Sequence, residues 1–302
     1  MPMSVNRWAA GVLVASAVAA LVAPHLHARD DGPVTWVDAA SLVSPQLIED
    51  ATAMAQKNGA KTLLVRVREH GDSYFLNGLE PRPMALLSLP AFDPLAAIIA
   101  SAHARGLAVH AWINVNLIAG TDVPLERGHV VYRHPEWLMV PRDIADELAR
   151  LDMEGPEYLG RLTRYARSRP AEIEGLYLSP VTQAAVDYTT SVVRDIVTRY
   201  AVDGVYFDYL RYPGDDFDYS REALRAFGQS VTQFPDRWRR FRADRLTALL
   251  DALRAAVKTA RPTAVVSVAV PADPVVAFTR YLQDWSGWMK KGLLDTTFSA
   301  PF

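Results

Sequence analysis

The chain has 302 residues, of which 50% are apolar and 22% charged, a composition typical of a folded globular protein rather than a disordered one. Its 32 basic and 34 acidic side chains give a formal net charge of −2, which argues against a general nucleic-acid binder, because neutralising phosphates needs a basic surplus. Cysteine is absent, so disulfides, thiolate nucleophiles and thiolate-held metals are excluded, and beyond residue 28 no two histidines have the spacing of a metal-ligand pair. We therefore expect no cofactor and no metal.

Residues 1–28 have the pattern of an export signal. Arg7 supplies a positive charge, an apolar run rich in Ala and Val extends from Trp8 to Ala23, and Ala28 is a suitable last residue before cleavage. The run is shorter than the ~20 apolar residues that a membrane-spanning helix prefers. We therefore expect cleavage before Arg29, no stable membrane span afterwards, and a periplasmic or extracellular location.

Short β-branched apolar runs alternate with helical patterns along the rest of the chain. In chain order the predicted strands are 34–39, 62–68, 107–115, 203–210, 264–270 and 295–301. The predicted helices are 45–58, 94–105, 182–200, 239–260 and 280–291, and long connections cover 116–176 and 213–236. Alternating strands and helices predict an α/β fold with a parallel sheet that is buried on both faces.

A TIM (β/α)8-type barrel fits this alternation best. Such a barrel takes roughly 250 residues and carries its chemistry at the carboxyl ends of its strands. Polar and aromatic residues collect at those ends here, and no glycine-rich nucleotide-binding motif follows any strand. We expect residues 29–302 to form one barrel domain that is incomplete at its C-terminus, because only six strands precede Phe302. A fragment is the leading explanation; completion by another chain and a degenerate barrel are the alternatives.

The segment Tyr200–Pro213, YAVDGVYFDYLRYP, contains the most informative strand end. Period-2 alternation places Tyr206 and Asp208 on one face, and Asp208 lies late enough in the strand to reach the barrel mouth. A carboxylate there can protonate a leaving oxygen, act as a nucleophile or stabilise a positively charged sugar centre. The competing interpretation makes Asp208 an ion-pair partner of Arg211 or Arg68.

The third predicted strand carries His110, Trp112, Asn114 and Asn116 on one face. Sugars are bound by this combination, because their ring faces stack on aromatic side chains and their hydroxyls need directional hydrogen bonds. We therefore predict that these four residues bind substrate. The alternative for Trp112 and His110 is burial in the core.

Charged residues end the second predicted strand, where they need partners or a function. Glu69 is the candidate for a second catalytic carboxylate, and Arg68 is a candidate for substrate binding. Beyond Asp208, we predict that Tyr209 and Arg211 also contact the substrate.

Several of these motifs resemble one known family, the glycosyl-hydrolase-like 10 (GHL10) proteins of the bacterial envelope. The similar segments are HAWINV (110–115), HPEWL (134–138), YLSP (177–180), VVRDIVTRYAVDGVYFDYLRYP (192–213) and WMKKGLLD…AP (288–301). The resemblance implies an exported TIM-barrel glycosidase, and the family includes an enzyme that acts on peptide-stripped peptidoglycan glycan. By position, Asp208 is the aspartate of the family's FDY(L/I)RYP strand end and Asn114 closes its HAW strand; the second carboxylate stays open.

The sequence thus predicts a glycoside hydrolase that cleaves O-glycosidic bonds in a cell-envelope or extracellular polysaccharide, with peptidoglycan glycan as one candidate. Asp208 and Glu69 would be the catalytic residues, and the partner would be a polysaccharide, not a nucleic acid. The alternative is a non-catalytic carbohydrate-binding protein on a degenerate barrel. A third option is a scaffold that binds another envelope protein.

Overall fold

The computed structural model describes residues 32–122, 124 and 126–299. The predicted export signal, residues 1–28, lies outside the described residues. Within them, no helix combines the length and the apolar character needed to cross a membrane.

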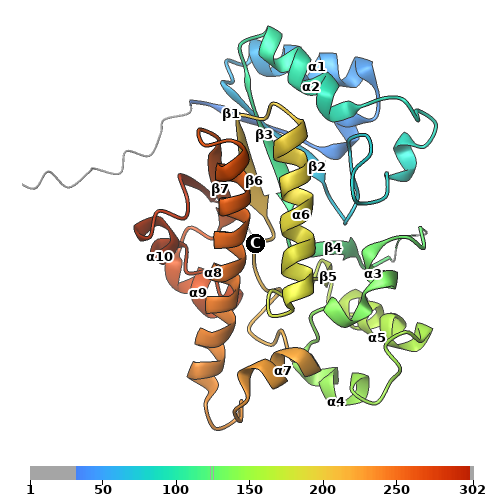
Figure 1. Ribbon diagram of the computed structural model, residues 1–302, viewed down its shortest axis with the longest axis vertical. Coiled ribbons are helices and arrows are strands. Elements are labelled where there is room, and N and C mark those ends of the chain that lie inside the picture. The colour runs from blue at the N-terminus through green and yellow to red at the C-terminus, as the bar shows by residue number, and fades with distance from the viewer. Residues whose placement is uncertain (1–31, 123, 125, 300–302) are drawn as a thin grey trace, which may run out of the picture.

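A six-stranded parallel sheet organises the chain, in the spatial order β1-β2-β3-β6-β7-β8 (Figure 1). Its strands are β1 (Val34–Val37), β2 (Thr62–Arg68), β3 (Ala108–Asn114), β6 (Gly204–Asp208), β7 (Val265–Val270) and β8 (Thr296–Ser299). Each of the six predicted strands is confirmed. The four inner strands are almost wholly buried apolar runs, as parallel strands covered on both faces should be, whereas the outer strands β1 and β8 are partly exposed.

The sheet curls into a half-barrel. The ring of Trp36 on β1 meets that of Phe298 on β8 edge to face, with 6.0 Å between ring centroids, although these two outer strands are not hydrogen-bonded to each other. We call the concave side of this sheet the lumen. The fold is therefore a mixed α/β structure with a curled parallel sheet, as part of a TIM-type barrel would be.

One long helix lies in each connection between successive parallel strands from β1 to β7: α1 (Pro45–Lys57), α2 (Pro94–Ala104), α6 (Gln183–Arg199) and α8 (Pro235–Ala260). The first two begin at side chains that cap their free backbone N–H groups, since Ser44 accepts from Leu47 N and Asp93 from Ala96 N. Figure 1 shows α6 and α8 running side by side along the sheet, and these two helices contact each other extensively.

The predicted single helix over residues 280–291 is wrong. Two short helices, α9 (Pro274–Tyr281) and α10 (Trp285–Lys290), occupy this region. Leu282 ends α9 in the left-handed conformation, with φ 60°, and the Asp284 side chain then starts α10 by accepting a hydrogen bond from Gly287 N. An apolar residue with positive φ leaves no sequence signal, so the break was not visible in the pattern.

The two long connections fold into small elements of their own. The first contains an antiparallel pair, β4 (Leu117–Gly120) with β5 (Gly175–Tyr177), and the helices α3 (Val130–Arg133), α4 (Ala145–Leu148) and α5 (Pro156–Arg167). The second contains α7 (Arg221–Phe227), and single 3-10 turns cover Ala39–Leu42, Met84–Leu86, Pro135–Trp137 and Arg142–Ile144. Figure 1 shows α3, α4, α5 and α7 together at one end of the sheet, beyond the carboxyl ends of β3 and β6.

Alternation along the strands divides the buried side chains into two groups. On β2, Leu63, Val65 and Val67 belong to the large core between sheet and helices. The lumen holds a separate apolar cluster of Leu64, Trp112, Tyr206 and Ala269, against which Phe298 packs. Two residues further along β2, β3 and β6, at the carboxyl ends of these strands, the same face carries Arg66, Asn114 and Asp208.

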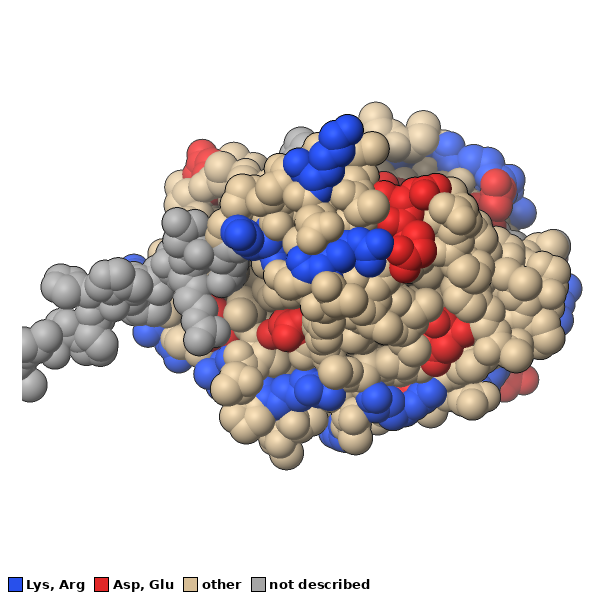
Figure 2. Space-filling view, turned by 90° about the horizontal axis from the view of Figure 1, so that it is seen from above, with Lys and Arg blue, Asp and Glu red and all other residues tan. Residues whose placement is uncertain are grey.

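The opposite end of the sheet, seen from above in Figure 2, shows basic and acidic side chains interspersed with uncharged ones. This end carries the amino-terminal starts of the parallel strands.

Candidate active site

Asp208, the last residue of β6, lies beside the end of β3. The two strands are in register with Asn114 opposite Asp208. The Asp208 carboxylate accepts one hydrogen bond from the Trp112 indole N–H, at 3.1 Å, and another from Tyr209 N, at 2.8 Å. Asp208 as a whole is only 8% exposed, so its carboxylate is held by two donors in a largely dry position.

Burial raises the pKa of the Asp208 carboxyl above its ordinary value, since a charged group is less stable away from water. The hydrogen bond from Tyr209 N and the positive charges of Arg211 and Arg66 act in the opposite direction but do not cancel the effect of burial. A carboxyl group with a raised pKa retains its proton to higher pH, as a general acid requires.

Arg66, one layer above the lumen cluster, links Asp208 to a second carboxylate. Its guanidinium lies over the Trp112 ring, 3.7 Å from the ring centroid, and it pairs with Glu69 at 2.8 Å. Trp112 in turn donates to Asp208. Glu69 and Asp208 therefore flank a single stack of Arg66 on Trp112.

Glu69 follows β2 directly and is the more open of the two carboxylates, with a side chain 28% exposed. Its carboxylate is held by Arg66, and the side chain of Asn114 donates to its backbone carbonyl at 2.8 Å. Both ends of Glu69 are thereby tied to neighbouring elements. This places a carboxylate with access to solvent at the same strand ends as Asp208.

Tyr209 has a backbone conformation that few residues other than glycine adopt, with φ 51°. A non-glycine residue in this region costs of the order of 1 kcal/mol or more, and such residues cluster at functional sites. The turn places Tyr209 half-buried, with its ring edge to face against Tyr177 at 6.2 Å. Tyr209 O also accepts from Asn116 N, so β3 and β6 stay together beyond their formal ends.

Two asparagines at the end of β3 carry buried amide atoms that make no hydrogen bond to the described residues. They are Oδ1 of Asn114 and both amide atoms of Asn116, whose residues are 2% and 1% exposed. Buried polar atoms are almost always hydrogen-bonded in folded proteins, so these atoms call for a partner at the site. Their position beside Asp208 and Tyr209 is consistent with the predicted role in binding substrate hydroxyls.

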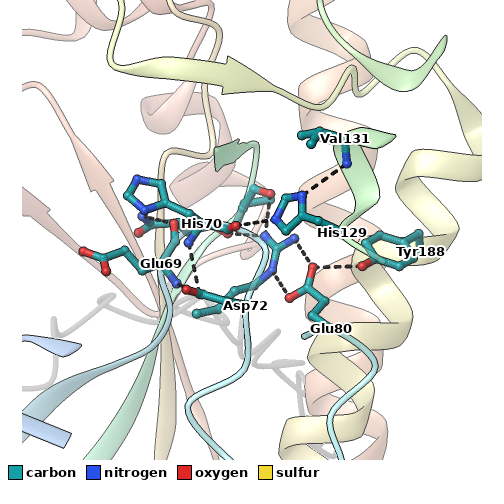
Figure 3. Close-up of polar contacts among 10 residues, drawn as sticks. Glu69, His70, Asp72, Glu80, His129, Val131 and Tyr188 are labelled. Carbon is teal, nitrogen blue, oxygen red and sulfur yellow. Dashed lines mark hydrogen bonds and ion pairs between the residues drawn. The ribbon is translucent and has the colours of Figure 1, made fainter. Parts of the chain in front are cut away.

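Arg68 does not reach the lumen or the solvent, contrary to a direct role in binding substrate. It is 0% exposed and pairs through two nitrogens with the equally buried Glu80, at 2.6 and 2.7 Å. Its remaining nitrogen donates to the backbone carbonyls of Asn114 and Val115. Figure 3 shows that Glu80 also accepts a hydrogen bond, 3.0 Å long, from the hydroxyl of Tyr188 on α6.

Arg211 is likewise buried, at 1% exposure, where its guanidinium pairs with Glu174 at 2.6 Å and lies 5.1 Å from the Tyr209 ring centroid. Arg68 and Arg211 are thus buried beside the carboxyl ends of the strands, where Arg68 binds the backbone carbonyls of Asn114 and Val115 and Arg211 pairs with Glu174. His110 lies at the other end of β3, against Gly204 in the lumen, and not with the other predicted residues. The structure brings together Asp208, Glu69, Trp112, Asn114, Asn116 and Tyr209.

A cavity of about 570 Å³ opens next to this group, between the loop after β2 and the β4–β5 pair. It is lined by His70, Asp72, Gly120, Asp122, His129 and Glu174, among others. In Figure 3, Asp72 accepts from the backbone N–H groups of Glu69 and His70, at 2.9 and 3.1 Å, and the His129 ring nitrogen meets the His70 carbonyl at 2.7 Å. These bonds fix the shape of the loop that carries Glu69.

Several supporting residues were missed by sequence reasoning. Glu80, Asp72 and Glu174 occupy loops without periodicity, and each acts through hydrogen-bond partners that only the three-dimensional structure reveals. Arg66 did carry a signal, because a charge within a buried strand needs a partner.

The arrangement offers two carboxyl groups beside a Trp112 ring that is 6% exposed and has the Arg66 guanidinium over one face. Among the residues that the structure describes, no three or more acidic or histidine side chains gather in a way that would hold a metal ion. A buried carboxyl with a raised pKa and a second, more open carboxylate suit proton transfer to and from a bound molecule, and the indole N–H of Trp112 orients the first of them.

Comparison with protein families gives one match that spans most of the chain. Residues 34–299 match the family model described as Glycosyl hydrolase-like 10.

Among curated proteins, the chain is similar to the glycosyl hydrolase DigH of Escherichia coli strain K12, with 26% identity over 286 residues that cover 84% of this chain and 57% of that protein. It is also similar to the glycosyl hydrolase YngK of Bacillus subtilis strain 168, with 24% identity over 68% of this chain and 36% of that protein. The chain therefore spans about half the length, or less, of these relatives.

Among solved structures, the glycoside hydrolase domain of PgaB (BpsB) from Bordetella bronchiseptica superposes with a TM-score of 0.61 at 17% identity, covering 88% of this chain and 73% of that chain. Alpha-L-fucosidase isoenzyme 2 from Paenibacillus thiaminolyticus gives a TM-score of 0.52 at 18% identity, covering 78% of this chain and 32% of that chain. At these identities the likeness is one of fold.

Proposed function

The chain belongs to the glycosyl hydrolase-like 10 family, and from this premise we propose that it is a glycoside hydrolase acting on O-glycosidic bonds of a cell-envelope or extracellular polysaccharide. The half-barrel would then be part of a TIM-type barrel with its chemistry at the carboxyl ends of the strands. The names of the relatives and the glycoside hydrolase fold of the structural neighbours support the reaction class.

One observation carries the proposal: the buried Asp208 carboxyl, hydrogen-bonded to Trp112, shares the Arg66–Trp112 stack with the more open Glu69. Glycosidases of the usual kind use two carboxyl groups in different environments, one protonated and one ionised. Asp208 is 8% exposed and the Glu69 side chain is 28% exposed, so the two carboxyl groups lie in different environments.

The residues divide into three roles. Asp208 is the acid or the nucleophile, and Glu69 is the second carboxylate. Trp112 and Tyr209 shape the sugar subsites, while the amides of Asn114 and Asn116 bind hydroxyl groups of the substrate. Arg68 and Arg211 are positioning residues, because Arg68 gives all three of its nitrogens to Glu80 and backbone carbonyls and Arg211 is held by Glu174 and the Tyr212 carbonyl.

The export signal predicted at residues 1–28 supports an envelope or extracellular substrate, for which peptidoglycan glycan is one candidate. A polysaccharide partner also agrees with the aromatic and amide groups at the strand ends.

The proposal is tested by reducing-end release from a glycan panel that includes intact and peptide-stripped peptidoglycan. Wild type should release reducing ends from at least one glycan, and Asp208→Asn should abolish the release while the circular dichroism spectrum is unchanged. Release that survives Asp208→Asn would overturn the assignment of Asp208. Retention of glycan by folded wild type without any release would instead support the non-catalytic carbohydrate-binding alternative.

A further inference from the structure

A second cavity, of about 550 Å³, lies at the amino-terminal ends of the strands, on the end of the sheet opposite to Asp208. Its wall is formed by the starts of β2, β3, β6 and β7, and Figure 2 looks on to this end of the molecule. Four basic side chains line it, Lys61, His103, His110 and Arg261, together with a single acidic one, Asp203. No residue of the proposed catalytic group belongs to this lining.

Small residues keep this end of the lumen open. Ala108, Ala201 and Ala264 line the cavity, and Gly204 provides the place where His110 lies. A Cβ atom on Gly204 would come within 2.7 Å of the His110 ring, so the imidazole requires glycine at this position. In a fully packed barrel, layers of larger side chains would fill this volume.

The charges around the cavity are unbalanced. Arg105 and Arg199 pair with Glu49 and Asp195. Neither Lys61 nor Arg261, which line the cavity, forms an ion pair with any described residue. Arg261 uses its Nε to hold the Val197 carbonyl at 2.7 Å, which leaves its two terminal nitrogens for another acceptor.

Asp203 does not neutralise these cations. One oxygen of its carboxylate, Oδ2, accepts from Val109 N at 2.8 Å and meets the His103 ring nitrogen at 2.9 Å. Oδ2 of this carboxylate is therefore engaged in joining β3 to β6 and in orienting His103, and among the described residues neither Lys61 nor Arg261 has an acidic side chain as an ion-pair partner.

Helix ends explain only part of this arrangement. Arg261 directly follows α8, where a cation is favoured by the partial negative charge of the helix C-terminus. Lys61, however, lies beyond the end of α1, past Gly59 and Ala60, with its stem packed over Gly32. A helix-end role therefore does not account for the convergence of both cations on one cavity.

We propose that this cavity binds a phosphate-type anion, either free phosphate or the phosphate group of a small phosphomonoester. A tetrahedral dianion presents oxygens in several directions, which suits cations that arrive from β2 and β7 on separate sides, whereas a planar carboxylate is satisfied by one arginine. Lys61 and Arg261 would supply the charge, and the imidazole of His103, which lines the same cavity, would supply a further donor.

The test follows the imidazole nitrogens of His103 by ¹⁵N NMR while inorganic phosphate is added to the purified chain at constant ionic strength and pH. A saturable shift is expected at this ring. The double variant Lys61→Gln/Arg261→Gln should weaken binding by about tenfold or more, because two charge-assisted contacts are lost. The matched control Lys290→Gln/Lys291→Gln removes two lysines outside the cavity and should leave the affinity unchanged.

A shift that never saturates, or a double variant that binds as tightly as wild type, would overturn the proposal and leave the two cations with helix-end roles only. If the double variant fails to fold, the single variant of the exposed Lys61 provides the same comparison. A sugar phosphate that competes with inorganic phosphate identifies an ester as the source of the anion; failure to compete identifies free phosphate.

Discussion

Two aspartates five positions apart, one just before β6 and one at its end, show how differently the two ends of the sheet are built. Asp203 precedes β6, and its side chain is 43% exposed, while Asp208 ends the same strand at 8% exposure for the whole residue. Each carboxylate receives two hydrogen bonds: Asp203 from Val109 N and His103, Asp208 from Tyr209 N and Trp112.

Burial, and not the number of hydrogen bonds, distinguishes the two carboxylates. Asp203 remains in contact with water and joins two strands. Asp208 is desolvated, which raises the pKa of its carboxyl, and the next residue, Tyr209, has a strained backbone. Desolvation and strain cost stability, and folded proteins retain such costs mainly where function requires them.

The largest expected effect is the loss of stability when the buried Arg68–Glu80 ion pair, beside the carboxyl ends of the strands, is broken. Glu80→Gln leaves the buried Arg68 without its counter-charge and should lower the free energy of unfolding by about 3–5 kcal/mol, measured by urea denaturation. Tyr188→Phe removes only the hydroxyl that donates to Glu80 and should cost about 1.5–3 kcal/mol at most. Equal losses in the two variants would show that the ion pair contributes nothing beyond the hydrogen bond.

Glu69→Gln tests whether the second carboxylate takes part in the reaction. Loss of a general acid, base or nucleophile at this position should reduce kcat about 100-fold or more on the glycan that wild type cleaves. Asp38→Asn is the matched control, because Asp38 also pairs with Arg66, at 3.3 Å, but is 65% exposed. A similar loss in both variants would assign the effect to Arg66 instead of Glu69.

Asp203→Ala tests whether Asp203, at the amino-terminal end of the sheet, stabilises the fold without taking part in the reaction. The variant leaves the buried Val109 N–H without its acceptor, so the free energy of unfolding should fall by about 1–3 kcal/mol. The reducing-end activity of the folded protein should stay within a few-fold of wild type. A large loss of activity without loss of stability would contradict the division between the two ends.

The smallest effect is the pH dependence of stability that Asp208 contributes. Burial raises the pKa of its carboxyl in the folded protein, so the folded state binds this proton more tightly than the unfolded state. The resulting stability is complete below the unfolded pKa of about 3.9 and is lost as the pH rises through the folded value. Urea denaturation at pH 4 and pH 7 should show wild type losing stability relative to Asp208→Asn as the pH rises; a constant difference would contradict the raised pKa.

The parallel strands were predictable because burial on both faces forces a continuous apolar pattern. Period-2 alternation on β3 and β6 also placed Trp112, Asn114 and Asp208 on the lumen face, since a strand leaves only two choices of face. The same rule placed His110 on this face, but it does not say at which end of the strand a side chain acts. His110 consequently lies two layers from Asn114.

What the sequence did not reveal is decided by partners distant in the chain. Arg68 and Asn114 are both polar residues at strand ends, yet only Arg68 finds a buried carboxylate, Glu80, in the loop that follows its strand. The antiparallel pair of β4 with β5 was missed because its two strands are short and separated by the whole first long connection. Leu282 ended a helix without the glycine that usually marks such a position.

The most direct test of the central claim compares Asp208→Asn with Asp203→Asn, the same chemical change at the two ends of one strand. Reducing-end release from the glycan that wild type cleaves is measured for both folded variants. Chemistry confined to the carboxyl end predicts that Asp208→Asn abolishes release and that Asp203→Asn keeps it within a few-fold of wild type. Equal activity in the two variants, or loss in Asp203→Asn alone, would contradict Asp208 as the catalytic carboxyl group.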